Sequence, residues 1–260
     1  MLLAANVGNS IVSFGIFKDE GELIASFDIS SDIKRTSDEY LFLTKNILDS
    51  KGISCDFIQG AILSSVVPVL TPKVSAVLAD IVGKEPLIVG PGVKTGFHIK
   101  IDNPSELGSD MVANTAAVLK LKNQNKAAIT VDLGRINTVS AISKNGEYLG
   151  CVIFPGLQLS FDALHEGTAL LPNVNQTFYS KAIGKSSQSA VSSGVILGSA
   201  LSVDGFVAKF TREMKISADE TELFATGEYA EIILSNCKNS FVYEKDLTLR
   251  GLYHIYRNNL

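Results

Sequence analysis

Two segments of the chain combine a polar side chain, a glycine and flanking apolar stretches in a pattern that suits phosphate chemistry. They are Asn6-Val7-Gly8-Asn9-Ser10 near the start of the chain and Asp132-Leu133-Gly134-Arg135 near its middle. A glycine in a tight strand–turn–strand lets backbone N–H groups approach a phosphate, and a neighbouring carboxylate can hold Mg²⁺ or another cation. An ordinary hairpin also places a glycine at its turn, so either segment alone fits both interpretations.

A third segment contains Asp110, which the sequence places in the first turn of a helix. It follows PGVKTG at 91–96 and DNPSELGS at 102–109, and the Pro-Gly and Thr-Gly pairs predict a rigid loop. We expect the helix N-terminus to stabilise the ionised carboxylate of Asp110 and thereby to lower its basicity. Such a carboxylate can still accept a hydroxyl proton that leaves late in a loose phosphoryl transfer. The alternative is an aspartate that only begins the helix.

The composition of the chain limits the classes of protein that it can form. The 260 residues are 46% hydrophobic and 19% charged, with a mean hydropathy of +0.23, which suits one large domain or two smaller ones and excludes extensive disorder. The net charge of −4 argues against non-specific nucleic-acid binding, which depends on Lys and Arg. The three cysteines, Cys55, Cys151 and Cys237, are expected to be reduced thiols.

Signals for export or membrane insertion are not evident in the sequence. No apolar run is expected to reach the roughly 18–20 residues that a membrane span needs. The first ten residues, MLLAANVGNS, lack the basic region of a secretory signal. We therefore expect a cytoplasmic protein without a membrane segment.

The chain contains an internal repeat. Residues 1–29 and 127–154 each hold three apolar stretches separated by turns, which predicts a three-stranded meander in each. Asn6-Val7-Gly8 aligns with Asp132-Leu133-Gly134, and with a shift of one residue Gly21 aligns with Gly146. The repeat predicts two similar halves, and the polar stretch at 121–126 places the boundary between a first domain of residues 1–123 and a second of 124–260.

Helical and strand patterns alternate after each meander. Helices are expected to begin at the capping box of Thr36, at Thr71-Pro72, at Ser109, at Ser186 (running to about residue 216) and at Asp246. Buried strands are expected at 61–67, 86–90 and 222–227. Strands that alternate with helices predict an α/β protein with layered helices and sheets.

Two glycine hairpins followed by a strand that ends in Thr226-Gly227 resemble the layout shared by actin, the sugar kinases and the heat-shock chaperone ATPases. Within that superfamily the chain resembles the type III pantothenate kinases over nearly its whole length. The motifs that carry this resemblance are, in order, NVGNS, PGVKTG, DNPSELGSD, VDLG, NGEYLG, PGLQLSFDALHEGTALLP, IGKSS and ATG. The resemblance implies duplicated actin-like (ribonuclease H-like) domains, in which mixed sheets are flanked by helices.

The resemblance also implies an activity and a set of site residues. The family phosphorylates pantothenate with ATP and Mg²⁺, the first step of coenzyme A biosynthesis. By position, Asp110 is the catalytic base, while Gly108, Ser109, Met111 and Ser187 bind the substrate. The implied nucleotide contacts are Asn6, Gly8, Asn9, Ser10, Gly134, Arg135 and Gly227. Asp132 takes the position that binds a monovalent cation, K⁺ or NH₄⁺, and a homodimer is implied because family sites are completed across the subunit boundary.

Four residues depart from the family pattern, and all of them lie in the site motifs. Asn6 stands where the family has aspartate, Met111 where it has arginine, Arg135 where the second hairpin has threonine, and Glu228 where the adenosine motif has a second glycine. Ile136 also replaces an alanine in that second hairpin. Asn6 and Met111 each remove a charge, and Arg135 and Glu228 each add one beside the expected nucleotide.

These departures leave two main interpretations of the function. One is a working pantothenate kinase with an altered nucleotide site, and the other is a catalytically impaired paralogue that keeps the fold as a ligand-binding or regulatory protein. A transcriptional regulator is a third class, but the acidic balance and the lack of a helix-turn-helix with basic flanks disfavour direct DNA binding. A small molecule is therefore the expected partner, besides a second copy of the chain.

Overall fold

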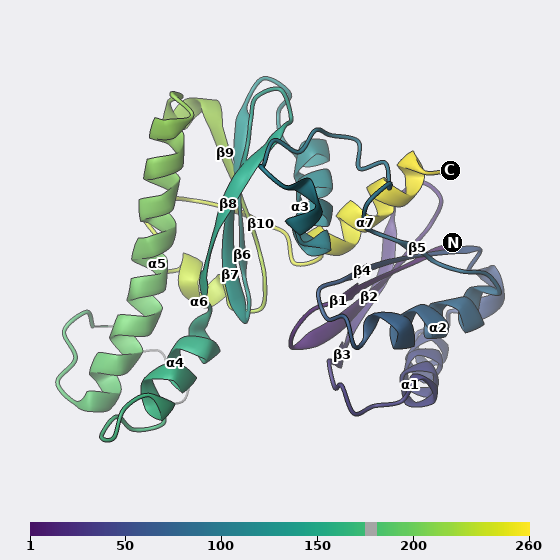
Figure 1. Ribbon diagram of the computed structural model, residues 1–260, viewed down its shortest axis with the longest axis horizontal. Coiled ribbons are helices and arrows are strands. Elements are labelled where there is room, and N and C mark those ends of the chain that lie inside the picture. The colour runs from purple at the N-terminus through teal and green to yellow at the C-terminus, as the bar shows by residue number, and fades with distance from the viewer. Residues whose placement is uncertain (175–180) are drawn as a thin grey trace. The chain divides into compact units, whose positions relative to one another are not determined.

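A computed structural model describes residues 1–174 and 181–260 of the chain. The chain divides into two compact units (Figure 1). Unit 1 consists of Met1–Leu121 and Asp246–Leu260, and unit 2 consists of Lys122–Lys245. Each unit contains one five-stranded mixed sheet with helices packed against it, so the predicted α/β class with two halves is confirmed.

The sheet of unit 1 has the strand order β3-β2-β1-β4-β5. Its strands are β1 (Leu2–Val7), β2 (Ile11–Phe17), β3 (Leu23–Ser30), β4 (Gly60–Ser65) and β5 (Leu87–Ile88). The first three strands form an antiparallel meander, and β4 runs parallel to β1. Strand β1 is buried on both faces, which its continuous apolar sequence LLAANV predicts.

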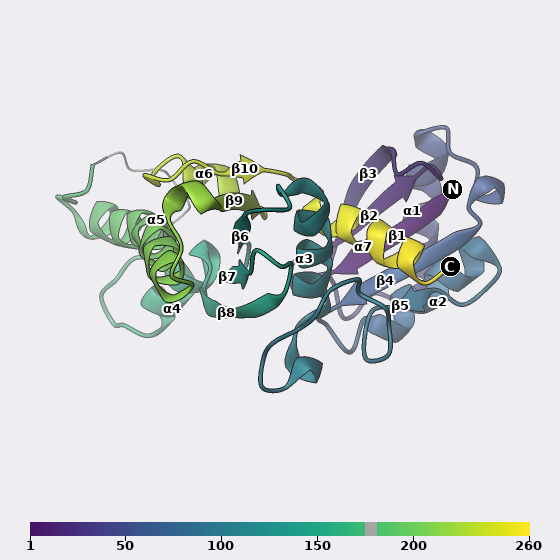
Figure 2. The ribbon, with the colours of Figure 1, turned by 90° about the horizontal axis from the view of Figure 1, so that it is seen from above.

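Helices cover both faces of this sheet. They are α1 (Ser37–Ser50), α2 (Thr71–Val82), α3 (Ser109–Leu121) and α7 (Leu247–Asn258), with 3₁₀ turns η1 (Cys55–Phe57) and η2 (Pro104–Glu106). Because strand side chains alternate between faces, Leu3 and Val7 of β1 pack in one core with α1 and α2. Leu2 and Ala4 pack in a second core with α3 and α7. Figure 2 shows α7 lying along this second face.

The sheet of unit 2 has the order β10-β9-β6-β7-β8. Its strands are β6 (Ala127–Leu133), β7 (Ile136–Ile142), β8 (Tyr148–Pro155), β9 (Thr221–Thr226) and β10 (Val242–Tyr243). Its helices are α4 (Leu157–Glu166), α5 (Ser187–Glu213) and α6 (Ala230–Leu234), with the 3₁₀ turn η3 (Ala218–Glu220). One core joins Ile129, Val131 and Leu133 of β6 to these three α-helices.

The two sheets confirm the repeat seen in the sequence. In both, the first strand is central, pairs with the second antiparallel and with the fourth parallel, and the second and third strands shift register near their far end. The one-residue shift in the alignment lies in the first turn. Three residues, Gly8 to Ser10, connect β1 to β2, whereas only Gly134 and Arg135 connect β6 to β7.

Several helix starts agree with the sequence-based predictions. Thr36 accepts a hydrogen bond from the Glu39 backbone and completes a capping box, and Pro72 occupies the first turn of α2. The strand expected at 86–90 is shorter than predicted, because β5 pairs only at Leu87 and Ile88. The three cysteines are free thiols, as expected.

The last helix, α7, belongs to a different unit from the one that the predicted domain boundary implied. The predicted second domain of 124–260 contains α7, but α7 belongs to unit 1, where it packs on α3. Gly251 makes this approach possible, since an added Cβ there would overlap the Ala113 carbonyl. Thr248 also donates a hydrogen bond to Asn114 Oδ1 at 2.7 Å. The apolar stripe of α7 is visible in the sequence, but the surface that it covers is not.

Helix α5 corrects the expectation that no segment is long and apolar enough to cross a membrane. By length and composition alone, α5 meets that criterion. Half of its most apolar window is buried inside the structure, and Val191, Val195 and Val203 contact the core of unit 2. This burial is what the central helix of a folded domain requires.

Candidate functional site

The β1–β2 turn of unit 1 contains three of the predicted nucleotide-binding residues, Gly8, Asn9 and Ser10. Gly8 N–H donates to Ile11 O at 2.9 Å and closes the turn. Ser31, the residue after β3, holds the turn from outside, because its hydroxyl donates to Gly8 O at 2.6 Å and its N–H donates to Ser10 O at 2.9 Å. Asn9 is exposed at the tip, while Gly8 and Ser10 are half-buried. The turn therefore has a defined backbone with one polar side chain at its outer edge.

Asn6 lies in β1, two residues before Gly8, and its side-chain oxygen has no partner among the described residues. Its Oδ1 atom is buried and accepts no hydrogen bond from the described residues. A buried amide oxygen without a donor costs free energy, so such positions are usually completed by water, an ion or a ligand. The predicted phosphate turn of unit 1 thus carries an unused oxygen acceptor.

A ladder of hydrogen bonds joins Asn6 to the segment that contains Asp110. Asn6 pairs with Ser64 in the parallel register of β1 and β4. The Ser64 hydroxyl donates to Ser109 Oγ at 2.9 Å, and Ser65 N–H donates to the same oxygen at 3.0 Å. Ser109 in turn donates to Ser65 O at 3.1 Å. The first turn of α3 is thereby fixed to the carboxyl end of β4, beside the end of β1.

Asp110 is held in place by its immediate neighbours. Its Oδ1 accepts a hydrogen bond from Met111 N–H at 2.7 Å. Gly108 leaves room for this arrangement, because an added Cβ would lie 2.6 Å from Asp110 Oδ1 and 3.2 Å from the Met111 Cε methyl. The predicted substrate residues Gly108, Ser109 and Met111 are therefore grouped around the carboxylate in unit 1.

The basicity of Asp110 differs from the expectation drawn from its helix position. Burial raises the pKa of its carboxyl above the ordinary value, and the backbone hydrogen bonds from Met111 and Asp110 itself offset only part of this effect. The expectation of a lowered basicity was wrong, because it counted the helix N-terminus and not the removal of water from the carboxylate. A carboxylate with a raised pKa is a stronger base, which suits proton abstraction from an alcohol.

Unit 2 brings together four predicted residues, Asp132, Gly134, Arg135 and Gly227, at the carboxyl ends of β6 and β9. Asp132 pairs with Thr226 in the parallel register, and the Gly134-Arg135 turn comes next in the chain. Gly227 has φ of 105°, and an added Cβ would lie 2.5 Å from Leu133 N, so only glycine fits there. Tyr229 N–H then donates to Leu133 O at 2.8 Å. The Thr226-Gly227 end of β9 is therefore packed directly against the second turn.

The departures at Arg135 and Glu228 are both exposed. Neither side chain fills the interior of unit 2. Asp132 is half-buried, and its carboxylate lies near Gly134. A Cβ added to Gly134 would lie 3.9 Å from Asp132 Oδ1. Ser187, a predicted substrate residue, is exposed at the start of α5, where Ser186 and Ser189 form the cap. The contacts described for Ser187 do not include the turn residues of unit 2.

Sequence reasoning missed four residues that build these turns. Ser31 clamps the first turn, and Ser64 links it to Ser109. In unit 2, Gly156 N–H donates to Arg135 O at 3.1 Å, and an added Cβ on Gly156 would overlap the Gly134 carbonyl. Asn137 is fully buried, donates to Pro155 O at 3.3 Å and leaves Oδ1 without a donor. Ser31 and Gly156 both follow the third strand of their sheet, so the repeat itself was the available signal.

The side chains present fit a cation that is held mostly by other oxygens. Among the described residues, no group of three or more His, Cys, Asp or Glu could hold a metal ion by itself. Mg²⁺ in kinases is bound by one or two protein oxygens together with phosphates and water, and its ligands are oxygens. The orphaned Oδ1 of Asn6 and the half-buried carboxylate of Asp132 are such oxygens. Each of these oxygens, taken within its own unit, fits a metal ion whose remaining ligands are phosphate oxygens and water.

The chain has the duplicated actin-like fold, with one five-stranded mixed sheet in each unit. The sequence matches the type III pantothenate kinase family model over residues 2–209. The chain therefore belongs to the type III pantothenate kinase family.

Solved structures of several other proteins share this fold. A protein assigned to the Baf family of transcriptional activators, from Campylobacter jejuni, is 19% identical, with a TM-score of 0.61 over 99% of this chain and 98% of that chain. The activator of 2-hydroxyisocaproyl-CoA dehydratase from Clostridium difficile, with bound ADPNP, is 10% identical, with a TM-score of 0.56 over 99% and 94%. A polyphosphate/ATP-glucomannokinase from Arthrobacter is 11% identical, with a TM-score of 0.51 over 99% and 98%. At these identities the likeness shows the fold alone.

Proposed function

We propose that the protein phosphorylates pantothenate with ATP, the first step of coenzyme A biosynthesis. The observation that carries this proposal is the arrangement around Asp110. Its carboxyl has a raised pKa, its Oδ1 is fixed by Met111 N–H, and its helix is anchored to β4 through Ser109. Family membership supplies the reaction class, and this geometry supplies a residue able to perform the proton transfer.

Asp110 acts as the general base in this proposal. Because Met111 N–H occupies Oδ1, the second carboxylate oxygen accepts the proton from the pantothenate hydroxyl. The hydroxyl oxygen then attacks the terminal phosphorus of ATP as the bond to the ADP oxygen breaks, and the proton rests on Asp110 until product leaves. In a loose phosphoryl transfer, most of the catalysis comes from positioning and charge stabilisation, so a rigid anchor for Asp110 matters as much as its pKa.

The two glycine turns hold the nucleotide phosphates in this proposal. In unit 1 the contacts are the turn from Gly8 to Ser10 and the free Oδ1 of Asn6. In unit 2 they are Gly134 and Gly227, and the exposed guanidinium of Arg135 adds a positive charge that can meet a phosphate. Mg²⁺, when bound, neutralises charge on the phosphates. Asn6 contributes an oxygen to that complex without the charge of the family's aspartate.

Further parts of the proposal rest on family membership. Asp132 is the ligand for a monovalent cation, K⁺ or NH₄⁺, and the half-burial of its carboxylate supports this role. Ser187 supplies a hydroxyl to pantothenate, and the protein acts as a homodimer in the cytoplasm. The exposure of Ser187 is compatible with a contact that is completed by a second subunit.

The test is direct detection of phosphopantothenate. Purified protein is incubated with ATP, Mg²⁺, K⁺ and pantothenate, and the product is identified by mass spectrometry. Parallel reactions omit K⁺ or replace pantothenate with a hexose, because sugar kinases share the fold. Phosphorylation of pantothenate and not of the hexose supports the proposal. Phosphorylation of the hexose and not of pantothenate would contradict it.

A catalytically impaired paralogue is the second candidate function, and the four motif departures favour it. Under this alternative the protein binds ATP weakly, and a variant that combines Asn6→Asp, Arg135→Thr and Glu228→Gly gains ATP affinity and activity. Calorimetric titration with ATP and Mg²⁺ measures the first effect and the product assay measures the second. If the parent turns over pantothenate and the triple variant gains nothing, this alternative is wrong.

A further inference from the structure

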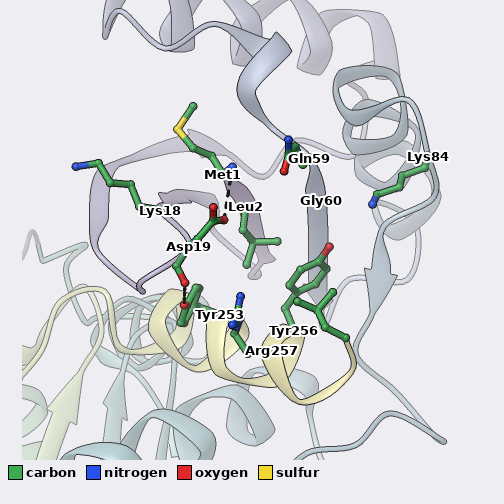
Figure 3. A pocket seen from close by; sticks show the side chains of 11 residues that line it. Met1, Leu2, Lys18, Asp19, Gln59, Gly60, Lys84, Tyr253, Tyr256 and Arg257 are labelled. Carbon is green, nitrogen blue, oxygen red and sulfur yellow. Dashed lines mark hydrogen bonds and ion pairs between the residues drawn. The ribbon is translucent and has the colours of Figure 1, made fainter.

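A pocket of about 250 Å³ opens in unit 1 at the end of the sheet opposite to the candidate active site. It lies at the amino ends of β1 and β4, between the β2–β3 turn, Lys84 just beyond the end of α2, and the last turns of α7 (Figure 3). Strand β1 runs from Leu2 to Val7, so at about 3.3 Å per residue the pocket lies roughly 20 Å from the Gly8 turn. It is therefore separate from the residues assigned to the kinase reaction.

Two tyrosines of α7 are fitted into this pocket by glycines on neighbouring segments. An ideal Cβ at Gly60 would overlap Tyr256 Oη and lie 2.7 Å from its Cζ, and an ideal Cβ at Gly21 would lie 2.9 Å from the Tyr253 ring. Tyr253 Oη donates to Asp19 O at 2.6 Å, and its ring stacks on Phe17 with centroids 5.1 Å apart. Tyr256 Oη, in contrast, makes no hydrogen bond with any described residue. The wall is rigid and presents one unused phenol.

The positive charges around the pocket fall into two groups. Lys18 forms an ion pair with Glu22 at 2.7 Å and points away from the pocket in Figure 3. Lys84 and Arg257 point toward the pocket from two different elements, and neither forms an ion pair or a side-chain hydrogen bond within the described part of the chain. The carboxylate of Asp19 is paired with the Met1 amino group at 3.9 Å. Two free cations thus face the pocket in a protein whose net charge is −4.

We propose that this pocket binds a small phosphate-bearing anion. Lys84 supplies a point charge, the Arg257 guanidinium supplies paired donors for two phosphate oxygens, and Tyr256 Oη donates a third hydrogen bond. A pocket of about 250 Å³ has room for inorganic phosphate, pyrophosphate or a short phosphate monoester. A phosphate dianion supplies the hydrogen-bond acceptor that the phenol lacks and the negative charge that the two cations lack among the described residues.

The test is calorimetric titration of the full chain with inorganic phosphate and with pyrophosphate at constant ionic strength. Lys84→Gln and Arg257→Gln remove one cation each from exposed side chains, so both variants are expected to fold. Lys45→Gln on α1 is the matched control, because it makes the same charge change at an exposed position outside the pocket. We expect each pocket variant to weaken binding about tenfold or more, and the control to bind as the parent does.

Two further variants separate this site from the kinase site. Gly60→Ala pushes Tyr256 out of place and is expected to weaken phosphate binding, whereas Asp110→Asn is expected to leave it unchanged. Phosphate binding that is equal in the parent, Lys84→Gln and Arg257→Gln would overturn the proposal, because the phosphate would then occupy another site. Absence of binding would also overturn it. The two basic residues would then serve only to complement the negative ends of α2 and α7.

Discussion

The β1–β2 turn of unit 1 and the β6–β7 turn of unit 2 occupy the same place in two copies of one sheet, yet they are held in different ways. In unit 1 the residue after the third strand is Ser31, and its hydroxyl binds Gly8 O from outside the turn. In unit 2 that residue is Gly156, which lets the backbone pack against Gly134 and Arg135. A three-residue turn needs a side-chain clamp, whereas the tighter two-residue turn needs the absence of a side chain.

The two turns also differ in the chemistry beside them. Unit 1 places a neutral amide, Asn6, before its turn and connects it through Ser64 and Ser109 to Asp110, the proposed base. Unit 2 places a carboxylate, Asp132, at its turn and packs Gly227 against Leu133. The duplicated sheet thus supplies two similar glycine turns, and the two copies differ in the residues near the carboxyl end of the fourth strand. Four predictions test this difference between the two turns.

The largest change in stability is expected from Gly156→Ala. The added methyl would overlap the Gly134 carbonyl and lie 2.6 Å from Arg135 O, so the backbone of the unit 2 turn must move. Overpacking of this kind costs about 1–3 kcal/mol. Thermal unfolding should therefore show a clear fall in Tm. Gly198→Ala on α5 is the matched control, since an added Cβ there meets nothing within 4 Å. Its Tm should be equal to that of the parent or higher, because alanine in a helix adds about 0.5–1 kcal/mol to the free energy of unfolding.

Ser109→Ala should have the next largest effect, because it breaks the link in unit 1 between the first turn of α3 and the end of β4. The variant loses the contacts to Ser64 Oγ, Ser65 N and Ser65 O and leaves buried groups without partners, which costs about 1–3 kcal/mol. The kcat of the proposed phosphorylation should fall as well, because Asp110 loses its anchor. Exposed Ser105→Ala is the control. Equal kcat and Tm in both variants would mean that this anchor has no role.

Ser31→Ala should have a smaller effect that is confined to the first turn. The hydrogen bond to Gly8 O contributes about 1 kcal/mol, which corresponds to a fall in Tm of about 2–4 °C. Ser202→Ala removes a hydroxyl that only bonds back to Gly198 O within α5, so it should leave Tm nearly unchanged. A Ser31 variant as stable as this control would show that the first turn needs no clamp.

The smallest effect concerns the stability of Asp110→Asn as a function of pH. The folded pKa of Asp110 lies above the ordinary value of 3.8, so between these two values the folded state binds more protons than the unfolded state. Stability therefore falls as pH rises through this window, and the deficit persists at neutral pH. Asp110→Asn should have a slightly higher Tm than the parent at pH 7, and the difference should shrink near pH 3. A lower Tm at pH 7 would show that the carboxylate is not destabilised by burial.

Much of the fold could be predicted because its signals are local. The apolar run at Leu2–Val7, the capping box at Thr36 and the glycine turns each depend on a few neighbouring residues. The sequence also showed a one-residue shift in the repeat, and the structure places that shift at the shorter Gly134-Arg135 turn. Such patterns report backbone conformation directly.

The parts that could not be predicted depend on contacts between distant segments. The amphipathic pattern of α7 does not indicate that this helix packs on α3. A serine at position 31 likewise does not indicate a hydrogen bond to Gly8 O. The pKa of Asp110 was predicted in the wrong direction for the same reason. The helix N-terminus is visible in the sequence, whereas the burial of the carboxyl depends on the folded unit.

The most direct test of the central claim, that unit 1 carries the base of a pantothenate kinase, is the rate of phosphopantothenate formation by Asp110→Asn. A general base contributes about 10²–10⁴-fold, so the variant should lose that factor in kcat while it remains folded. Asp80→Asn makes the same change at an exposed position of α2 and should keep the rate of the parent. An Asp110→Asn variant as active as the parent would contradict the account.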